Sequence, residues 1–343
     1  MKKKKPEKIA TRIVKQLEND FCLCHNAGRP YLLFGNQAIE IGSQQYKDFV
    51  SRDAYLKTGT APSETQLREI AQIQRGAALF GSEEKPVFVR VGAAGNSVVY
   101  LDLNDGKNTI IKIDSEGVRV AETPNVLFYR PPHLKPLPLP KLPGSLKNLN
   151  EIFKLQNDED YVLLRSVLCF WLRGRPGDRG TFPVMNFCGP AGSGKTTKAK
   201  ICKYLIDPAT PEARTPGKDP RELFIAAKNQ YCIGFDNVSY LDADMQDALC
   251  SLASRGGYGR KKNYTDDDES IFEECRPIIT NGIQFKARPD LQSRMVNIEL
   301  QQITSKNRKT EKQIWKEVEK QRPEILGGLL TALSRGIYAE RNN

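Results

Sequence analysis

The residues best suited to chemistry lie together in one glycine-rich stretch. Gly189, Gly194, Lys195 and Thr196 fit the pattern Gly-x-x-x-x-Gly-Lys-Thr, with an apolar run before them and a helix-forming run, residues 195–205, after them. In that context the glycines let backbone N–H groups turn onto a phosphate at a helix N-terminus. The expected phosphate-binding loop comprises Gly189, Pro190, Ala191, Gly192, Ser193, Gly194, Lys195, Thr196 and Thr197.

Such a loop predicts a nucleotide and its magnesium ion as ligands. Lys195 would reach the β- and γ-phosphates of ATP, and the Thr196 hydroxyl would hold Mg²⁺. An acid at the end of a second strand is needed to fix the ion, and the apolar run 231–235 ends in Asp236. A further apolar run ends in Asn281. In a parallel sheet these ends lie side by side, so Asn281 is expected to orient the attacking water or to sense the γ-phosphate.

Composition indicates a water-soluble protein of two or three domains with an anionic partner. The chain has 343 residues, 39% of them hydrophobic and 27% charged, and its formal net charge is +11. Residues 161–172 form the most apolar long stretch, which is too short to span a bilayer and contains Arg165. The lysine-rich start lacks the apolar core of a signal peptide. We therefore expect a cytoplasmic protein with no membrane contact.

The eight cysteines give one candidate metal site, which we consider weak. Only Cys22, Cys24 and His25 cluster, and no second Cys/His pair at metal-site spacing follows them. An ordinary β-strand explains these three residues better than a structural zinc site does.

The hydrophobic patterns predict an α/β fold in which a parallel-sheet domain follows a small α+β domain. A proline-rich stretch separates the two, and a short helical segment, with helices over 310–321 and 323–338, ends the chain. The expected segments are a basic α+β part (1–60), a helix with a small β-rich domain (61–130), a linker (131–145), the nucleotide-binding domain (146–305) and a helical end (306–343).

The order of these motifs resembles the AAA+ core of superfamily 3-like replicative helicases, a primase-associated P-loop family of phages, plasmids and mobile elements. The resemblance is strong over about residues 150–305 and weaker over 20–145. It implies a DNA helicase or translocase that hydrolyses ATP and works as a ring, commonly a hexamer, in element replication. The first 145 residues contain no evident primase domain. A primase or another replication protein would then be a separate partner.

The resemblance also implies roles for individual residues. Lys195 and Thr196 would bind phosphate and Mg²⁺, Asp236 would coordinate the metal, and Asn281 would be the first sensor. Arg294 is the first candidate, and Arg288 the second, for the arginine that reaches a neighbouring subunit's γ-phosphate.

Residues 259–274 resemble the hairpin that points into the central pore of such helicases. Arg260, Lys261 and Lys262 would there meet DNA phosphates, giving salt-sensitive binding that does not depend on sequence. An ordinary basic surface is the alternative for these three residues.

One position departs from the AAA+ pattern and leaves the reaction open. Many such ATPases follow the metal-binding aspartate with a glutamate, but this chain has Asn237, which cannot accept a proton. Three explanations are open: Asp236 serves both purposes, another acid such as Asp242 or Asp244 approaches, or hydrolysis is slow. Two other functions therefore compete with a helicase: an ATP-dependent loader or switch without unwinding, and a nucleotide-binding subunit that coats DNA.

Overall fold

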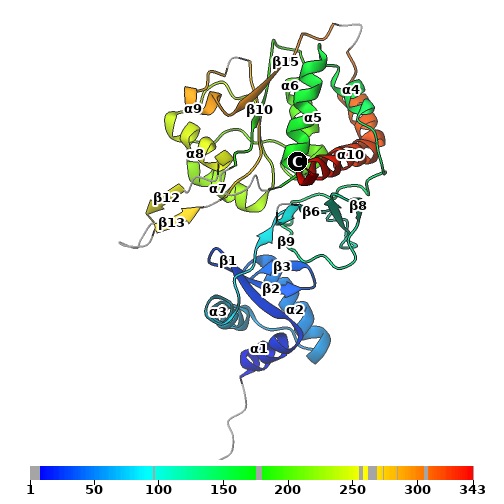
Figure 1. The fold of residues 1–343 in the computed structure, drawn as a ribbon. Helices are drawn as coiled ribbons and strands as arrows, with labels where there is room; N and C mark the ends of the chain where they lie inside the picture. The colour runs from blue at the N-terminus through cyan, green and yellow to red at the C-terminus, as the bar shows by residue number, and fades with distance from the viewer. Residues whose placement is uncertain are drawn as a thin grey trace, which may run out of the picture. The chain divides into compact units, whose positions relative to one another are not determined.

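The computed structural model describes residues 8–95, 97–174, 180–254, 258–261, 269–272, 274–283, 285–304 and 308–342 (Figure 1). Contacts divide the chain into two compact units. The first comprises residues up to 88 together with 124–132, and the second comprises 89–123 together with 133–343.

The first unit combines three helices with a five-stranded sheet of order β1-β2-β3-β9-β4. The unit's core is built by apolar residues of the helices and of β2 and β3, among them Leu17, Leu32, Tyr46 and Ile70. Cys22, Cys24 and His25 lie on strand β1, as expected of an ordinary strand. The elements are α1 (Ile9–Asp20), β1 (Cys22–Asn26), β2 (Arg29–Phe34), β3 (Gln37–Glu40), α2 (Gln44–Thr58), α3 (Glu64–Gly81), β4 (Val87–Phe88) and β9 (Leu127–Tyr129).

The second unit begins with a small antiparallel sheet. Its strands β5 (Val91–Ala94), β6 (Val98–Asp102), β7 (Ile110–Asp114) and β8 (Gly117–Val120) pair in sequence order. The expected β-rich segment 61–130 is thus divided between the units. The reason is pairing: among the described strands, β5 to β8 pair with one another, whereas β4 and β9 join the sheet of the first unit.

The central sheet of the second unit is parallel, as the sequence predicts. Its order is β11-β14-β10-β15, so sequence neighbours are separated and the carboxyl ends of all four strands share one edge. The strands are β10 (Val184–Cys188), β11 (Ile233–Phe235), β14 (Ile278–Asn281) and β15 (Met295–Glu299). An antiparallel hairpin, β12 (Tyr258–Lys261) with β13 (Glu269–Phe272), precedes β14.

Helices gather on both sides of this sheet (Figure 1). Helices α5 and α6 lie with α10 on one side, and α7, α8 and α9 lie on the other, where their apolar residues form a core cluster with β11 and β14. The helices are α4 (Lys147–Phe153), α5 (Asp158–Leu172), α6 (Lys195–Ile206), α7 (Pro220–Asn229), α8 (Ala243–Ser254), α9 (Pro289–Gln292) and α10 (Glu311–Asn342). No helix among the described residues is both long and apolar enough to cross a membrane.

The two expected C-terminal helices are one helix, which corrects the sequence reading. Pro323 lies inside α10. A proline removes one backbone donor and often ends a helix, but apolar residues on both sides of it, Val318, Ile325 and Leu329 among them, are buried. Burial of that continuous face offsets the lost hydrogen bond.

The proline-rich stretch packs against α10 through backbone contacts. Lys141 N–H donates to the Pro323 carbonyl at 2.9 Å, and Ser145 N–H donates to the Glu324 carbonyl at 3.0 Å. The approach is so close that a Cβ atom on Gly327 would lie 1.9 Å from the Lys141 carbonyl oxygen. Glycine is therefore required at this crossing.

This crossing predicts a position-specific effect of adding one methyl group to α10. Gly327→Ala forces the backbone of the linker away, so we expect it to lower the free energy of unfolding by about 1–3 kcal/mol. Gly336→Ala is the matched control, because the same helix leaves open space around Gly336. That control should stabilise the helix by up to about 1 kcal/mol. Urea unfolding measures both, and equal effects would contradict the docking of the linker on α10.

Candidate functional site

The glycine-rich loop, residues 189–194, joins the end of β10 to the start of α6 and needs glycine at its ends. Gly189 and Gly194 have φ angles of +138° and +80°, which side chains rarely allow. A Cβ atom on Gly189 would also lie 2.2 Å from the Leu300 carbonyl oxygen. Because the N-cap of α6 is Gly194, no side chain caps the first N–H groups of this helix. Those donors, with the helix dipole, favour an anion in the loop.

The ammonium group of Lys195 is folded back over this loop. Its Nζ donates to the carbonyl oxygens of Gly189 at 2.9 Å and of Pro190 at 2.7 Å. Within the described part of the chain, the buried Ser193 hydroxyl has no hydrogen-bond partner. The loop therefore presents a cation and unsatisfied donors to the same small space.

Three residues from separate motifs meet beside the loop. Thr196 Oγ1 donates to Asp236 Oδ1 at 2.9 Å and lies 3.5 Å from Asn281 Oδ1. Asp236 follows β11 and Asn281 ends β14, which are neighbours in the sheet. The sequence therefore predicted correctly that the two strand ends lie together. A hydroxyl and a carboxylate at hydrogen-bond distance suit Mg²⁺, which binds one or two protein oxygens and keeps several waters.

The amide of Asn281 is held from several directions. Its Nδ2 donates to the Phe235 carbonyl at 3.3 Å, and its Oδ1 accepts from the Asn237 N–H at 3.2 Å. The Val238 N–H also donates to the Asn281 carbonyl at 2.7 Å. These contacts fix the orientation of the buried Asn281 side chain toward Thr196.

The structure describes the positions of Asn237 and of the two other candidate acids, Asp242 and Asp244. Asn237 is exposed and has a left-handed backbone with φ of +55°. Asp242 caps α8 by accepting from the Met245 N–H at 2.8 Å, and Asp244 is exposed in the first turn of that helix. Neither carboxylate hydrogen-bonds to Thr196 in the part of the chain that the structure describes. Asp236 is the carboxylate that hydrogen-bonds to Thr196.

The two candidate arginines lie away from this group of residues. Arg288 pairs with Asp247 at 2.8 Å, and Arg294 donates to the Asp290 carbonyl at 2.5 Å. Across the described ranges, neither arginine hydrogen-bonds to Asp236. Both flank α9, so the structure does not bring them to the site of their own chain.

The three basic residues of the hairpin are only partly described. Arg260 and Lys261 lie on β12, paired with Ser270 and Glu269 of β13. Lys262 lies outside the described residues.

A row of polar side chains crosses the sheet below the loop, and sequence reasoning missed it. Asn186 of β10 accepts from Thr280 Oγ1 of β14 at 2.9 Å and donates to Asn297 Oδ1 of β15 at 2.8 Å. The three residues are direct partners in the strand register. One signal was available, since Asn186 and Asn297 each interrupt an otherwise apolar run, and Thr280 ends one. The row ties β10, which carries the loop, to both neighbouring strands.

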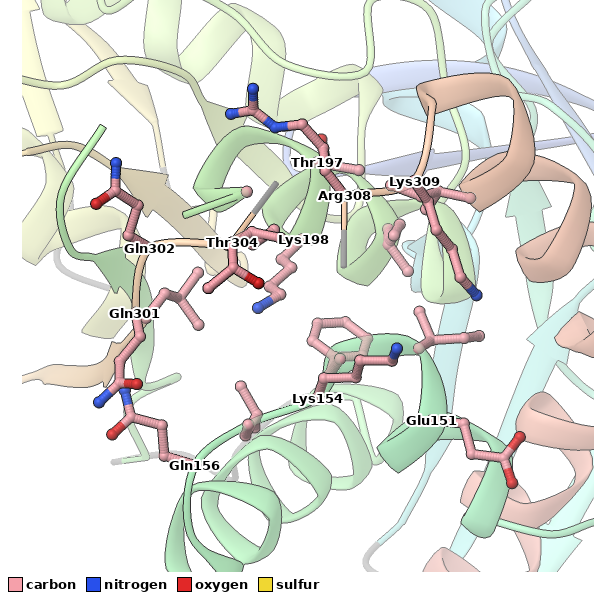
Figure 2. A pocket seen from close by; sticks show the side chains of 18 of the residues that line it. Glu151, Lys154, Gln156, Thr197, Lys198, Gln301, Gln302, Thr304, Arg308 and Lys309 are labelled. Carbon is pink, nitrogen blue, oxygen red and sulfur yellow. The ribbon is translucent and has the colours of Figure 1, made fainter. Parts of the chain in front are cut away.

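A cavity of about 360 Å³ opens beside α6 (Figure 2). No local pattern in the sequence predicted it. Gly194, Thr197 and Lys198 of the loop and α6 border it, while Thr196, which faces Asp236, does not. Its apolar wall includes Phe153, Leu155, Ile201, Leu300 and Ile303, and its polar side chains include Lys154, Gln156, Gln301, Gln302 and Thr304. The cavity thus adjoins the loop on the side away from the Thr196–Asp236 pair.

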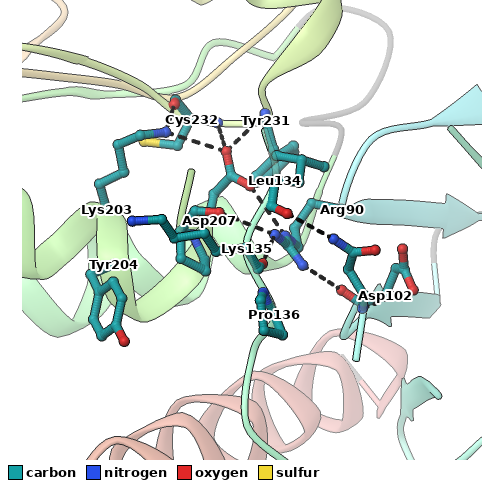
Figure 3. A network of polar contacts seen from close by, with 12 residues as sticks. Arg90, Asp102, Leu134, Lys135, Pro136, Lys203, Tyr204, Asp207, Tyr231 and Cys232 are labelled. Atoms are coloured by element: carbon teal, nitrogen blue, oxygen red, sulfur yellow. Dashed lines mark hydrogen bonds and ion pairs between the residues drawn. The ribbon is translucent and has the colours of Figure 1, made fainter. Parts of the chain in front are cut away.

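A buried charged cluster joins the far end of α6 to the start of β11 (Figure 3). Asp207 accepts from Arg90 Nε at 3.1 Å and lies 3.4 Å from Lys203 Nζ. Its Oδ2 also accepts from the N–H groups of Tyr231 and Cys232, both at 2.9 Å. Burial alone would raise the pKa of Asp207, but Lys203 and Arg90 hold that pKa below its ordinary value. The cluster fixes α6 against the strand that ends at Asp236.

Comparison with known proteins gives one family and several distant structures. Residues 152–341 match the family described as actinomycete integrative conjugative element replication protein. No curated protein matches the chain. Similar solved structures include the apo C-terminal region of NrS-1, with 13% identity over 93% of this chain and 68% of that chain and a TM-score of 0.49. They also include the JCV helicase, with 18% identity over 58% of this chain and 60% of that chain and a TM-score of 0.32.

Proposed function

We propose that this chain, which belongs to the family of actinomycete integrative conjugative element replication proteins, is an ATP-driven motor with an AAA+ P-loop core that acts on DNA. The observation that carries the proposal is the meeting of Thr196, Asp236 and Asn281 beside the glycine-rich loop. Binding and hydrolysis of a nucleoside triphosphate require such groups at a helix N-terminus: a hydroxyl, a carboxylate and a fixed amide.

In this proposal the loop and Lys195 hold the β- and γ-phosphates. The lysine would exchange the Gly189 and Pro190 carbonyls for phosphate oxygens, which are stronger acceptors. Thr196 and Asp236 would hold Mg²⁺, which when bound supplies positive charge to the β- and γ-oxygens. Asn281 would orient the attacking water.

The nucleoside would occupy the 360 Å³ cavity. Gly194 and Thr197 border it, so a nucleotide with its phosphates in the loop would reach the cavity directly. The volume lies within the range of small-molecule sites, and the apolar wall with glutamines and a threonine suits a flat ring bearing polar edges.

DNA would be the anionic partner that the net charge of +11 indicates. We place Arg260, Lys261 and Lys262 at its phosphates. Arg294, or else Arg288, would act on the site of a neighbouring copy, because each lies away from Asp236 in its own chain. That requirement is the basis for proposing a ring, and a hexamer is the form we propose. A primase or other replication protein would act alongside it.

Turnover and strand displacement together test this function. We expect ATP turnover to rise on addition of single-stranded DNA and to fall with added salt, because salt weakens phosphate contacts. A forked duplex should also be unwound. Stimulated turnover without unwinding would favour a loader or switch. Nucleotide binding without turnover would favour a DNA-coating subunit, which is the alternative that Asn237 supports.

A further inference from the structure

Lys198 is a cation without a counter-ion in the wall of the cavity. It lies on α6, three positions after Lys195, and its side chain points into the cavity (Figure 2). Among the described residues its ammonium makes no hydrogen bond and no ion pair. Burial, only slightly offset by nearby Cys202, lowers the pKa of Lys198 from 10.5 to about 8. Lys198 is half-buried, and no carboxylate of the described residues pairs with its ammonium.

Other charges line the cavity, but none is placed against Lys198. Lys309 and Glu317 pair with each other at 2.6 Å. The remaining charged side chains of the lining are exposed, and they are Glu151, Lys154, Glu299 and Arg308. Partial burial of a lysine ammonium without a neighbouring carboxylate is unfavourable unless a ligand supplies the negative charge.

The position of Lys198 along α6 indicates which part of a ligand would supply this negative charge. Lys195 and Thr196 face the loop and Asp236, Thr197 borders both the loop and the cavity, and Lys198 lies in the cavity. A nucleotide that runs from the loop into the cavity passes this boundary at its α-phosphate.

We propose that Lys198 is a further nucleotide-binding residue, which donates to the α-phosphate of a nucleotide whose nucleoside lies in the cavity. This inference rests on the proposed nucleotide site and adds a residue that the glycine-rich motif does not include. A charged hydrogen bond of this kind contributes roughly a tenfold or greater gain in affinity.

The test measures ADP and pyrophosphate binding by the full chain and by two variants. Lys200→Met is the control, since Lys200 lies on the same helix but does not line the cavity. We expect Lys198→Met to weaken ADP binding about tenfold at pH 7.5. Pyrophosphate has no nucleoside to direct one of its phosphates to the cavity, so its binding by Lys198→Met should stay within about twofold of wild type, as should ADP binding by Lys200→Met.

Two results would overturn the role of Lys198 while leaving the nucleotide site intact. They are unchanged ADP affinity in Lys198→Met, and a loss for pyrophosphate equal to the loss for ADP. A wild-type chain that binds neither ligand would instead reject the proposed function, and the inference with it.

Discussion

Replacing Asp236 by asparagine is expected to reduce ATP turnover by at least about a hundredfold while nucleotide binding persists. Asp236 is the carboxylate that hydrogen-bonds to Thr196, at 2.9 Å, and in our proposal the two residues hold Mg²⁺ together. Asparagine keeps the shape and the hydrogen bond but removes the negative charge that a hard cation needs. Phosphates would still bind to the N–H groups of the loop and to Lys195.

The matched controls are Asp242→Asn and Asp244→Asn. Asparagine caps helices as well as aspartate does, so Asp242→Asn should leave α8 intact. We expect both variants to retain turnover within about threefold of wild type, because single exposed charges distant from a site alter catalysis little. Steady-state turnover and ADP titration measure the two properties separately. If either control lost activity as Asp236→Asn does, the assignment of Asp236 as the site's acid would be wrong.

The largest effect on stability is expected from Asp207→Ala. This change leaves Arg90 and Lys203 buried without their shared carboxylate, and it strips the Tyr231 and Cys232 N–H groups of their acceptor. Removing one partner of a buried ion pair typically costs about 3–5 kcal/mol. Urea unfolding should show a loss of that size, together with weakened turnover, because the cluster fixes the strand that ends at Asp236.

An exposed ion pair of the same unit provides the control. Arg173 and Glu340 lie 2.7 Å apart with partly exposed side chains, so Glu340→Gln should change stability by less than about 1 kcal/mol. The pH dependence has a definite sign. The pKa of Asp207 lies below its ordinary value. The ionised carboxylate therefore contributes fully to the free energy of unfolding above the ordinary pKa, and this contribution is lost as pH falls toward the lowered pKa. A loss near neutral pH would contradict this assignment.

The sequence predicted the placement of the site's residues better than that of their surroundings. Lys195, Thr196, Asp236 and Asn281 could be placed because a glycine pattern and the ends of apolar runs are local signals, and parallel pairing then brings strand ends together. The row through Asn186 left only a weak signal: Asn186 and Asn297 each interrupt an apolar run, and Thr280 ends one.

Features that depend on distant pairing could not be predicted. Arg90 and Asp207 are 117 positions apart, and nothing local indicates that they meet. The cavity is likewise built from α4, α6 and the segment after β15, so Lys198 appears in the sequence as one more lysine of a basic helix. The expected segment 61–130 contains strands of both units for the same reason, since local alternation shows a strand but not its partner.

The central claim is that the glycine-rich loop is the site of ATP hydrolysis. The most direct measurement is steady-state ATP turnover by the wild-type chain and by Lys195→Ala, in parallel, at low salt with single-stranded DNA and Mg²⁺. We predict turnover by the wild type and its loss in the variant, because alanine removes the cation held over the loop at 2.7 Å from the Pro190 carbonyl. Equal turnover by the two proteins, or none by the wild type under these conditions, would contradict the account.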